Sequence, residues 1–272
     1  MGIQQISKIN IPFDMDSSFV AVWGAPIGIA LAMWVVFWIF SFFLVWFLLS
    51  LYCYKNESYT YKNKHVIITG GSSGIGLEMA KIYLSHGANV TIVARDKKKL
   101  EVAVKELSNT LVNINDSTKR IKSISLNVSS DLDTVSKALA SSVAEFGPCD
   151  VLVNCAGTSV AHPFGSTEVD SFRRMYEVNL LGSVYTTQAV LDGMRKQRSG
   201  RIIFVSSQLG QLGLHGYTAY CASKFALRGF AEALQMELKV HNVYVSVAHP
   251  PDTQTPGYDV EMLSKVSCGK YI

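Results

Sequence analysis

The stretch from His65 to Gly76 constrains this chain most, because it reads as a strand that turns sharply into a helix. Residues 66–68 form a short apolar run rich in β-branched side chains, and apolar residues at helical spacing begin at Leu77. The glycines between them permit positive φ and let a ligand approach the backbone closely. A helix that begins here directs unpaired N–H groups and the positive end of its dipole towards that ligand. The turn therefore predicts a phosphate-binding site.

Strand and helix patterns alternate along the rest of the chain. After the first strand we expect strands at 89–94, 121–126, 151–154, 201–205 and 243–248, and helices at 96–111, 131–146, 169–195 and 219–239. This alternation implies right-handed crossovers and a parallel sheet covered by helices on both faces. The predicted fold class is an α/β, doubly wound, mostly parallel sheet of the Rossmann type. Ligands in such folds bind beyond the carboxyl ends of the strands.

A long apolar segment precedes this domain. Residues 17–54 carry no charge. About 20 apolar residues span a bilayer as a helix, so we predict one N-terminal transmembrane helix over 23–54. A cleaved signal peptide would have a shorter apolar stretch with a basic region close before it. Three lysines follow the span at 55, 62 and 64, whereas Lys8 alone precedes it, and this bias predicts that the C-terminal side faces the cytosol.

The predicted organisation is an N-terminal tail of residues 1–22, the transmembrane helix of 23–54, a linker of 55–64 and a folded domain of 65–272. A net charge of +4 is too small to indicate nucleic-acid binding. The cysteines and histidines show no spacing typical of metal ligands, so we expect no metal.

Arg95 follows the second strand, where dinucleotide-binding folds contact the ribose of the cofactor. A guanidinium offers charge and planar donors to a 2′-phosphate, so Arg95 and Lys99, with the serines of the glycine turn, favour NADP(H) over NAD. Asp96 stands one residue too late to bind the ribose, and we interpret it as the N-cap of the following helix.

Tyr220 and Lys224 lie four residues apart in a predicted helix and so project from one face. The nearby ammonium should lower the pKa of the phenol from its usual value of about 10, so that Tyr220 can act as general acid in ketone reduction. Ser207, at the end of the strand at 201–205, could hydrogen-bond the substrate oxygen. Ser206 is the alternative, because neighbouring strand residues face opposite ways.

The turn T-G-G-S-S-G-I-G and the segment Y-C-A-S-K resemble the short-chain dehydrogenase/reductase family, and the resemblance runs from His65 to about Val260. It implies that Asn179 kinks a helix and holds a water that joins Lys224 to solvent. It implies that Asn127 accepts a hydrogen bond from the adenine amino group. It also identifies residues 154–157 as a turn beside the cofactor, in which we interpret Cys155 as a small buried hydrophobe and not a nucleophile.

Together these arguments define two predicted sets of site residues. The catalytic set is Asn179, Ser207, Tyr220 and Lys224. The cofactor-binding set is Gly70, Ser72, Ser73, Gly74, Ile75, Gly76, Arg95, Lys99, Asn127, Asn154, Ala156, Gly157, Tyr220 and Lys224.

Residues 200–238 and 242–257 are similar to members of this family that reduce a long-chain keto sphingoid base with NADPH at the cytosolic face of the endoplasmic reticulum membrane. The resemblance implies a lipid ketone substrate, NADP(H), a single-pass anchor in that membrane and a possible homo-oligomer. A membrane-anchored steroid or retinoid dehydrogenase is the alternative. The family pattern continues beyond Ile272, so we expect the C-terminal strand of the fold to be absent, and a non-catalytic cofactor-binding scaffold stays a third hypothesis.

Overall fold

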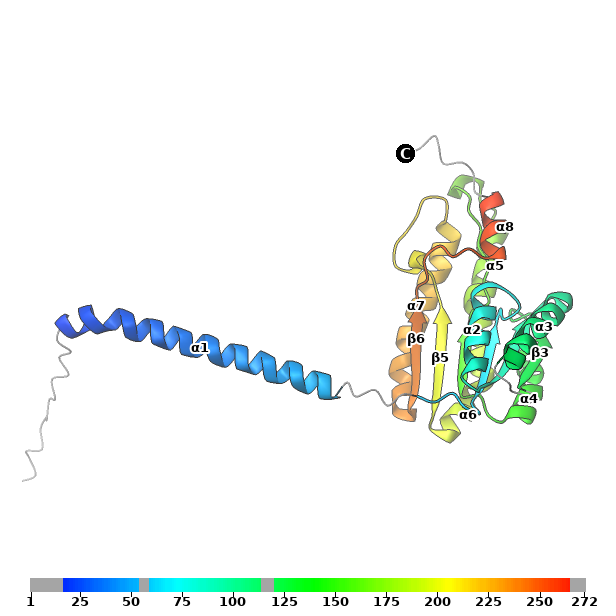
Figure 1. Ribbon diagram of the computed structural model, residues 1–272. Helices are drawn as coiled ribbons and strands as arrows, with labels where there is room; N and C mark the ends of the chain where they lie inside the picture. The colour runs from blue at the N-terminus through cyan, green and yellow to red at the C-terminus, as the bar shows by residue number, and fades with distance from the viewer. Residues whose placement is uncertain (1–16, 54–58, 114–119, 265–272) are drawn as a thin grey trace, which may run out of the picture. The chain divides into compact units, whose positions relative to one another are not determined.

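The computed structural model of the chain describes residues 17–53, 59–113 and 120–264. It divides into two units, Met1–Tyr59 and Thr60–Ile272. The first holds helix α1 (Ser17–Cys53), and the second holds the sheet and the remaining helices (Figure 1). Helix α1 begins six residues before the predicted start at position 23, because no glycine or proline interrupts residues 17–22. Residues 1–16 of the predicted tail and residues 54–58 around the predicted linker lie outside the described residues.

Helix α1 is apolar on all sides. Its segment Ala25–Ser50 spans 26 residues with a mean hydropathy of 2.4, and none of its most apolar stretch is buried within the unit. At about 1.5 Å per residue this segment is long enough for the roughly 30 Å hydrocarbon core of a bilayer. By length and composition, α1 is a candidate membrane span.

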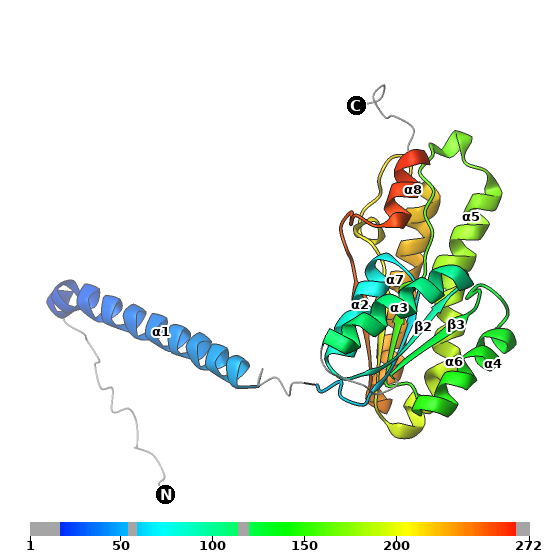
Figure 2. The same ribbon diagram turned by 45° about the vertical axis from the view of Figure 1, so that its right-hand side comes forward.

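Six parallel strands form the sheet of the second unit, in the order β3-β2-β1-β4-β5-β6 (Figures 1 and 2). The strands are β1 (His65–Thr69), β2 (Asn89–Ala94), β3 (Ile121–Ser125), β4 (Val151–Asn154), β5 (Gly200–Val205) and β6 (Val243–Ala248). The order reverses between β1 and β4, so the carboxyl ends of these two strands form the topological switch point. The predicted doubly wound α/β fold is confirmed.

Helices cover the two faces of the sheet. Helices α2 (Gly74–Ser85) and α3 (Lys97–Asn113) pack on each other and against β1, β2 and β3. Helices α4 (Leu132–Phe146), α6 (Gly182–Gln197) and α7 (Thr218–Leu238) belong to the other face.

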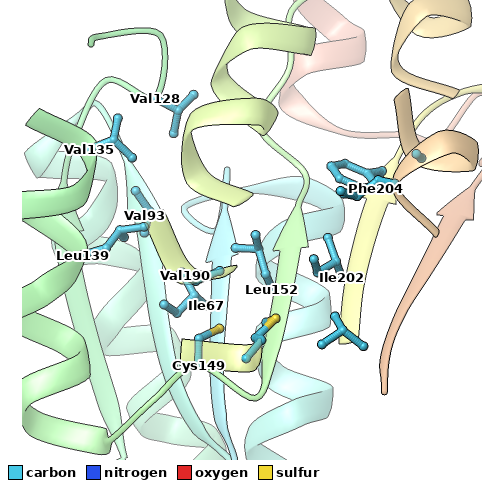
Figure 3. Packing of buried hydrophobic residues seen from close by; sticks show 14 of the residues in the cluster. Ile67, Val93, Val128, Val135, Leu139, Cys149, Leu152, Val190, Ile202 and Phe204 are labelled. Carbon is cyan, nitrogen blue, oxygen red and sulfur yellow. The ribbon is translucent and has the colours of Figure 1, made fainter. Parts of the chain in front are cut away.

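The larger hydrophobic core lies under α4, α6 and α7. Ile67 of β1 and Phe204 of β5 pack there with Leu139 of α4 (Figure 3). Val66 and Ile68, on either side of Ile67, are equally buried and point to the α2 and α3 face, as the two-residue period of a strand requires. Burial on both faces explains why the sequences of the central strands β1, β2 and β4 are almost continuously apolar.

The predicted helix at 169–195 is three elements in the structure. Helix α5 (Val169–Met175) is followed by a π-helical segment (Tyr176–Leu181) and then by α6. Such π segments are rare and frequently lie at functional sites. This one contains Asn179, the residue that the family resemblance assigned to a kink.

A further helix that the sequence analysis did not predict, α8 (Pro256–Ser264), follows β6. Short 3₁₀ turns occur at Phe164–Ser166, Gln208–Gly210 and Lys239–His241. Within the described residues, which end at 264, no strand follows β6.

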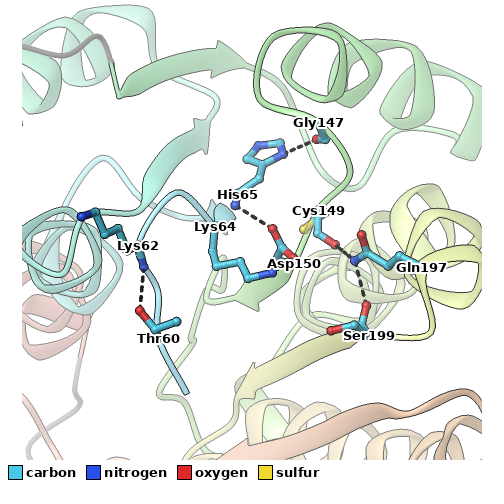
Figure 4. Close-up of polar contacts among 9 residues, drawn as sticks. All are labelled: Thr60, Lys62, Lys64, His65, Gly147, Cys149, Asp150, Gln197 and Ser199. Carbon is cyan, nitrogen blue, oxygen red and sulfur yellow. Dashed lines mark hydrogen bonds and ion pairs between the residues drawn. The ribbon is translucent and has the colours of Figure 1, made fainter. Parts of the chain in front are cut away.

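A partly buried polar cluster lies at the amino-terminal end of the sheet (Figure 4). Asp150 accepts hydrogen bonds from the Lys64 ammonium and the His65 backbone N–H, both at 3.0 Å, and so fixes the start of β1 beside β4. The His65 ring is 0% exposed, with Nδ1 2.8 Å from the Gly147 carbonyl oxygen and Nε2 3.0 Å from Thr91 Oγ1. Because a carbonyl only accepts, Nδ1 carries the proton, and Nε2 accepts from the Thr91 hydroxyl. Burial lowers the pKa of His65, although Gly147 and Asp150 raise it.

We predict that His65→Gln weakens the pH dependence of stability between pH 7 and 5. A histidine held neutral in the fold makes its full contribution above its unfolded pKa of about 6.5, and the contribution is lost as the pH falls, because the unfolded chain binds the proton first. The slope from one such group is at most about 1.4 kcal/mol per pH unit.

The measurement is urea denaturation of the full chain in detergent at several pH values, followed by far-ultraviolet circular dichroism. Fluorescence is unsuitable, because all four tryptophans lie in α1. Parallel curves for the parent and the variant would show that His65 does not titrate with folding.

Candidate functional site

A groove of about 320 Å³ lies at the carboxyl ends of β1, β2, β3 and β4. Most of the predicted cofactor residues line it, namely Gly70, Ser72, Ser73, Gly74, Ile75, Gly76, Arg95, Lys99, Asn127, Ala156 and Gly157. The structure therefore brings together side chains and turns that follow four different strands. This convergence is what a doubly wound sheet provides at its switch point.

The glycine turn between β1 and α2 forms the floor of the groove. Gly70 and Gly74 have φ angles of +70° and +55°, which glycine adopts without strain. A Cβ on Gly76 would lie 2.5 Å from the Gly70 carbonyl oxygen, so only glycine fits there. At the start of α2 the N-cap Ser73 makes no side-chain capping bond, and the first turn holds no acidic residue. The N–H groups of this turn fit the pyrophosphate of a dinucleotide.

Arg95 and Lys99 are exposed on the wall of the groove beyond β2. Asp96, between them, accepts hydrogen bonds from the backbone N–H groups of Lys98 at 2.9 Å and Lys99 at 3.1 Å. The interpretation of Asp96 as the N-cap of α3 is thus confirmed. Two cations at the mouth of the groove create a site that suits a phosphate.

Two asparagines of the predicted cofactor set have protein partners. Asn127 lines the groove, and its Oδ1 accepts from the Ser129 hydroxyl at 3.0 Å. Asn154 is 1% exposed and is not among the residues that line the groove. Its side chain accepts from Thr186 at 2.6 Å and donates to Thr187 at 3.1 Å. Asn154 therefore joins β4 to α6 and does not reach the cofactor groove.

Tyr220, Ser207 and Lys224 converge beside the groove. The Ser207 side chain lies close enough to the Tyr220 phenol to lower its pKa. The ammonium of Lys224 lies 5.7 Å from the centroid of the Tyr220 ring and donates to the Val205 carbonyl oxygen at 2.9 Å. Ser206 is 3% exposed, and its hydroxyl lies under α7, 3.3 Å from the Lys224 carbonyl oxygen. Of the two neighbouring serines, Ser207 is the one that contacts Tyr220.

The pKa of Tyr220 moves in the opposite direction to the sequence prediction. Burial raises it to about 12, and the carboxylates of Glu261 and Asp252 raise it as well, whereas the Ser207 side chain lowers it. Burial also lowers the pKa of Lys224 to about 8. The prediction of a lowered phenol pKa was wrong because it considered the neighbouring cation and not desolvation, the largest effect here.

Asn179 is completely buried below this cluster. It accepts from the Thr158 N–H at 2.8 Å, and it donates to the Thr158 carbonyl oxygen at 3.0 Å and to the Ser223 hydroxyl at 2.9 Å. A Cβ on Gly157 would lie 3.3 Å from Asn179 Oδ1 and 3.7 Å from Lys224 Nζ. The π-helical segment thus places Asn179 next to the buried end of Lys224.

The Cys155 thiol also lines the groove. Burial raises the pKa of this thiol to about 11, although Lys224 lowers it. A thiol with so high a pKa is protonated near neutral pH and is a poor nucleophile. This agrees with the interpretation of Cys155 as a small hydrophobe.

The sequence analysis missed the contribution of α8. Thr255 and Gly257 line the groove, and a Cβ on Gly74 would lie 3.0 Å from the Thr255 methyl carbon. Thr255 Oγ1 also accepts from the Tyr258 N–H at 3.2 Å, which caps the helix. A threonine followed by Pro256 at the first helical position is a helix-start signal that the sequence already contained.

Comparisons with known proteins agree with this geometry. The short chain dehydrogenase family model matches residues 64–261. The 3-dehydrosphinganine reductase of Danio rerio is 53% identical over 201 residues, which are 74% of this chain and 60% of that protein. The 3-ketodihydrosphingosine reductase of Bos taurus is 50% identical with the same coverage, and the 3-dehydrosphinganine reductase TSC10B of Arabidopsis thaliana is 40% identical over 84% of this chain and 68% of that protein.

A solved structure of a short-chain dehydrogenase also resembles this chain. The crystal structure of a short-chain dehydrogenase from Streptomyces avermitilis superposes with a TM-score of 0.63 at 31% identity, covering 71% of this chain and 67% of that one. The chain spans 60% of the length of its relatives from Danio rerio and Bos taurus.

We predict that Gly76→Ala destabilises the fold by about 1–3 kcal/mol, the usual cost of overpacking, because the new methyl group meets the Gly70 carbonyl. Gly229→Ala is the matched control, since this exposed glycine in α7 has nothing within 4 Å of an added Cβ. It should stabilise the helix by up to about 1 kcal/mol. Thermal denaturation of both variants checks this, and equal shifts in midpoint would show that the turn is not sterically tight.

Proposed function

The chain belongs to the short-chain dehydrogenase family, and from that premise we propose that it reduces the ketone of 3-ketodihydrosphingosine to give sphinganine with NADPH. The observation that carries the proposal is the convergence of Ser207, Tyr220 and Lys224 beside a glycine-lined groove. The names of the relatives from Danio rerio and Bos taurus support this choice of substrate.

NADPH would supply the hydride that reduces the substrate carbon. The N–H groups at the start of α2 would bind its pyrophosphate, and Arg95 and Lys99 would bind the 2′-phosphate that distinguishes it from NADH. Asn127 would contact the adenine, and Gly157 has no side chain that could obstruct the nicotinamide end.

Tyr220 would donate its proton to the ketone oxygen. A pKa near 12 keeps the phenol protonated near neutral pH, and the protonated form is the one that reduction requires. Ser207 would hydrogen-bond the same oxygen as negative charge develops on it. The ammonium of Lys224 would stabilise the phenolate that remains, and Asn179 would help to position Lys224 and hold the water that relays a proton to it.

The apolar helix α1 would anchor the protein in the endoplasmic reticulum membrane by a single pass. The lysines that follow α1 favour a cytosolic position for the folded unit. A long-chain ketone partitions into the bilayer, so a tethered enzyme meets it without extracting it into water.

We predict that Tyr220→Phe abolishes turnover, with a loss of at least about a hundredfold, because no proton donor remains at the ketone oxygen. NADPH should still raise the thermal midpoint of the variant, since the groove is unchanged. The measurement is NADPH oxidation by membranes that contain the protein, with 3-ketodihydrosphingosine as substrate.

The alternatives give different outcomes in the same assay. Turnover of a steroid or retinoid ketone but not of the sphingoid ketone would identify the other class of dehydrogenase. NADPH binding without any Tyr220-dependent turnover would indicate a non-catalytic scaffold.

We also predict that Arg95→Asp raises the Michaelis constant for NADPH about tenfold to a hundredfold, because a charge-assisted bond to the 2′-phosphate is lost and a repulsion replaces it. The constant for NADH should fall. Lys98→Asp is the matched control, since this lysine is also exposed at the start of α3 but does not line the groove. An unchanged ratio of the two constants in Arg95→Asp would exclude Arg95 as the selector.

A further inference from the structure

A chain of hydrogen bonds through two buried side chains joins the turn after β4 to helix α7. Asn179 accepts from the Thr158 N–H at 2.8 Å and donates to the Thr158 carbonyl oxygen at 3.0 Å. Its Nδ2 also donates to the Ser223 hydroxyl at 2.9 Å. Ser223 in turn donates to the Tyr220 carbonyl oxygen at 2.8 Å. Asn179 and Ser223 are both 0% exposed, so bulk water does not compete for these bonds.

The chemistry of these groups fixes the direction of each bond. An amide nitrogen only donates and a carbonyl oxygen only accepts, so the Ser223 hydroxyl accepts from Asn179 and donates to Tyr220. The two Nδ2 hydrogens of Asn179 are then used, one by Thr158 and one by Ser223. Thr158 and Ser223 together therefore hold the amide of Asn179 in one orientation.

The chain of bonds connects the cofactor groove to the helix that carries the proton donor. Thr158 directly follows Gly157, which lines the groove. A Cβ on Gly157 would lie 3.7 Å from Lys224 Nζ. At the other end, Ser223 lies in α7 between Tyr220 and Lys224. Ser223 is thus the residue through which α7 is bonded to the wall of the groove.

We propose that Ser223 is a positioning residue for ketone reduction, because it fixes the α7 backbone at Tyr220 relative to the turn at Gly157. The inference rests on the proposed function, in which Tyr220 protonates the ketone. Reacting atoms must lie about 3–3.5 Å apart, and a misplacement of about 1 Å can lower a rate about a hundredfold. Ser223 does not line the groove, so it acts only through Asn179 and the Tyr220 backbone.

Ser142 of α4 provides a matched control. Like Ser223 it is 0% exposed, and its hydroxyl donates to the carbonyl oxygen three residues earlier, that of Leu139, at 2.8 Å. Within the described residues, no side chain donates to the Ser142 hydroxyl. The two serines therefore make the same bond to their own helix, and only Ser223 also accepts from a residue of the site.

The test compares Ser223→Ala with Ser142→Ala in the full chain, with NADPH and 3-ketodihydrosphingosine. Both variants lose a buried hydroxyl and should show similar decreases in thermal midpoint. Ser223→Ala should lower kcat about tenfold, the effect expected when one positioning hydrogen bond is lost. The Michaelis constant for NADPH should change less than about twofold, because the groove is intact. Ser142→Ala should leave kcat unchanged.

Two further variants separate positioning from a packing defect. Ser223→Cys fills the space of the hydroxyl with a much weaker hydrogen-bonding group, so it should show the same loss of kcat as Ser223→Ala. In an Asn179→Ala background, Ser223→Ala should lower kcat much less than in the parent, because the bond between the two side chains is already gone. Product detection by mass spectrometry extends these measurements to slow variants. Equal losses in the two backgrounds would show that Ser223 does not act through Asn179.

Failure of the inference can be distinguished from failure of the proposed function. If the parent reduces 3-ketodihydrosphingosine but Ser223→Ala and Ser142→Ala have the same kcat, Ser223 is only structural, and the inference is wrong while the proposed function stands. If the parent reduces a steroid or retinoid ketone instead, the proposed substrate is wrong, and the same comparison with that ketone tests Ser223. A folded parent that reduces none of these ketones would overturn both.

Discussion

The close approach of two backbone segments in the glycine turn is the constraint on which the rest of the site depends. Gly76 packs against the carbonyl of Gly70 at a distance that excludes any side chain. This contact sets where α2 begins, and the first N–H groups of α2 therefore face the groove. Because β1 is central in the sheet, strands on both sides direct their carboxyl ends to the same place.

Desolvation is the second physical factor that shapes the site. It raises the pKa of Tyr220 and lowers that of Lys224, so burial disfavours the charged form of both groups. Burial therefore keeps the Tyr220 phenol protonated near neutral pH. The sequence spacing shows that Tyr220 and Lys224 are neighbours, but it does not show how far burial desolvates them.

Helix α8 and its N-cap connect the cofactor groove to the residues around Tyr220. Thr255 packs against Gly74 of the glycine turn, and one turn and a half later Glu261 contacts Ser159 and Tyr217. A single short helix and its N-cap residue therefore contact the glycine turn, the loop after β4 and the start of α7. Its position after β6 agrees with the general rule that loops beyond the strand ends carry the specificity of doubly wound folds.

The sequence by itself determined the fold class, the strands of the sheet, the glycine turn and the pairing of Tyr220 with Lys224, because these follow from local periodicity and from glycine sterics. Only the tertiary structure decided that Asn154 is a core residue bonded to α6, that Ser207 and not Ser206 reaches Tyr220, and that Glu261 accepts a hydrogen bond from Tyr217. These facts depend on contacts between residues distant in sequence and on burial. Neither can be read from the spacing of residues along a single chain.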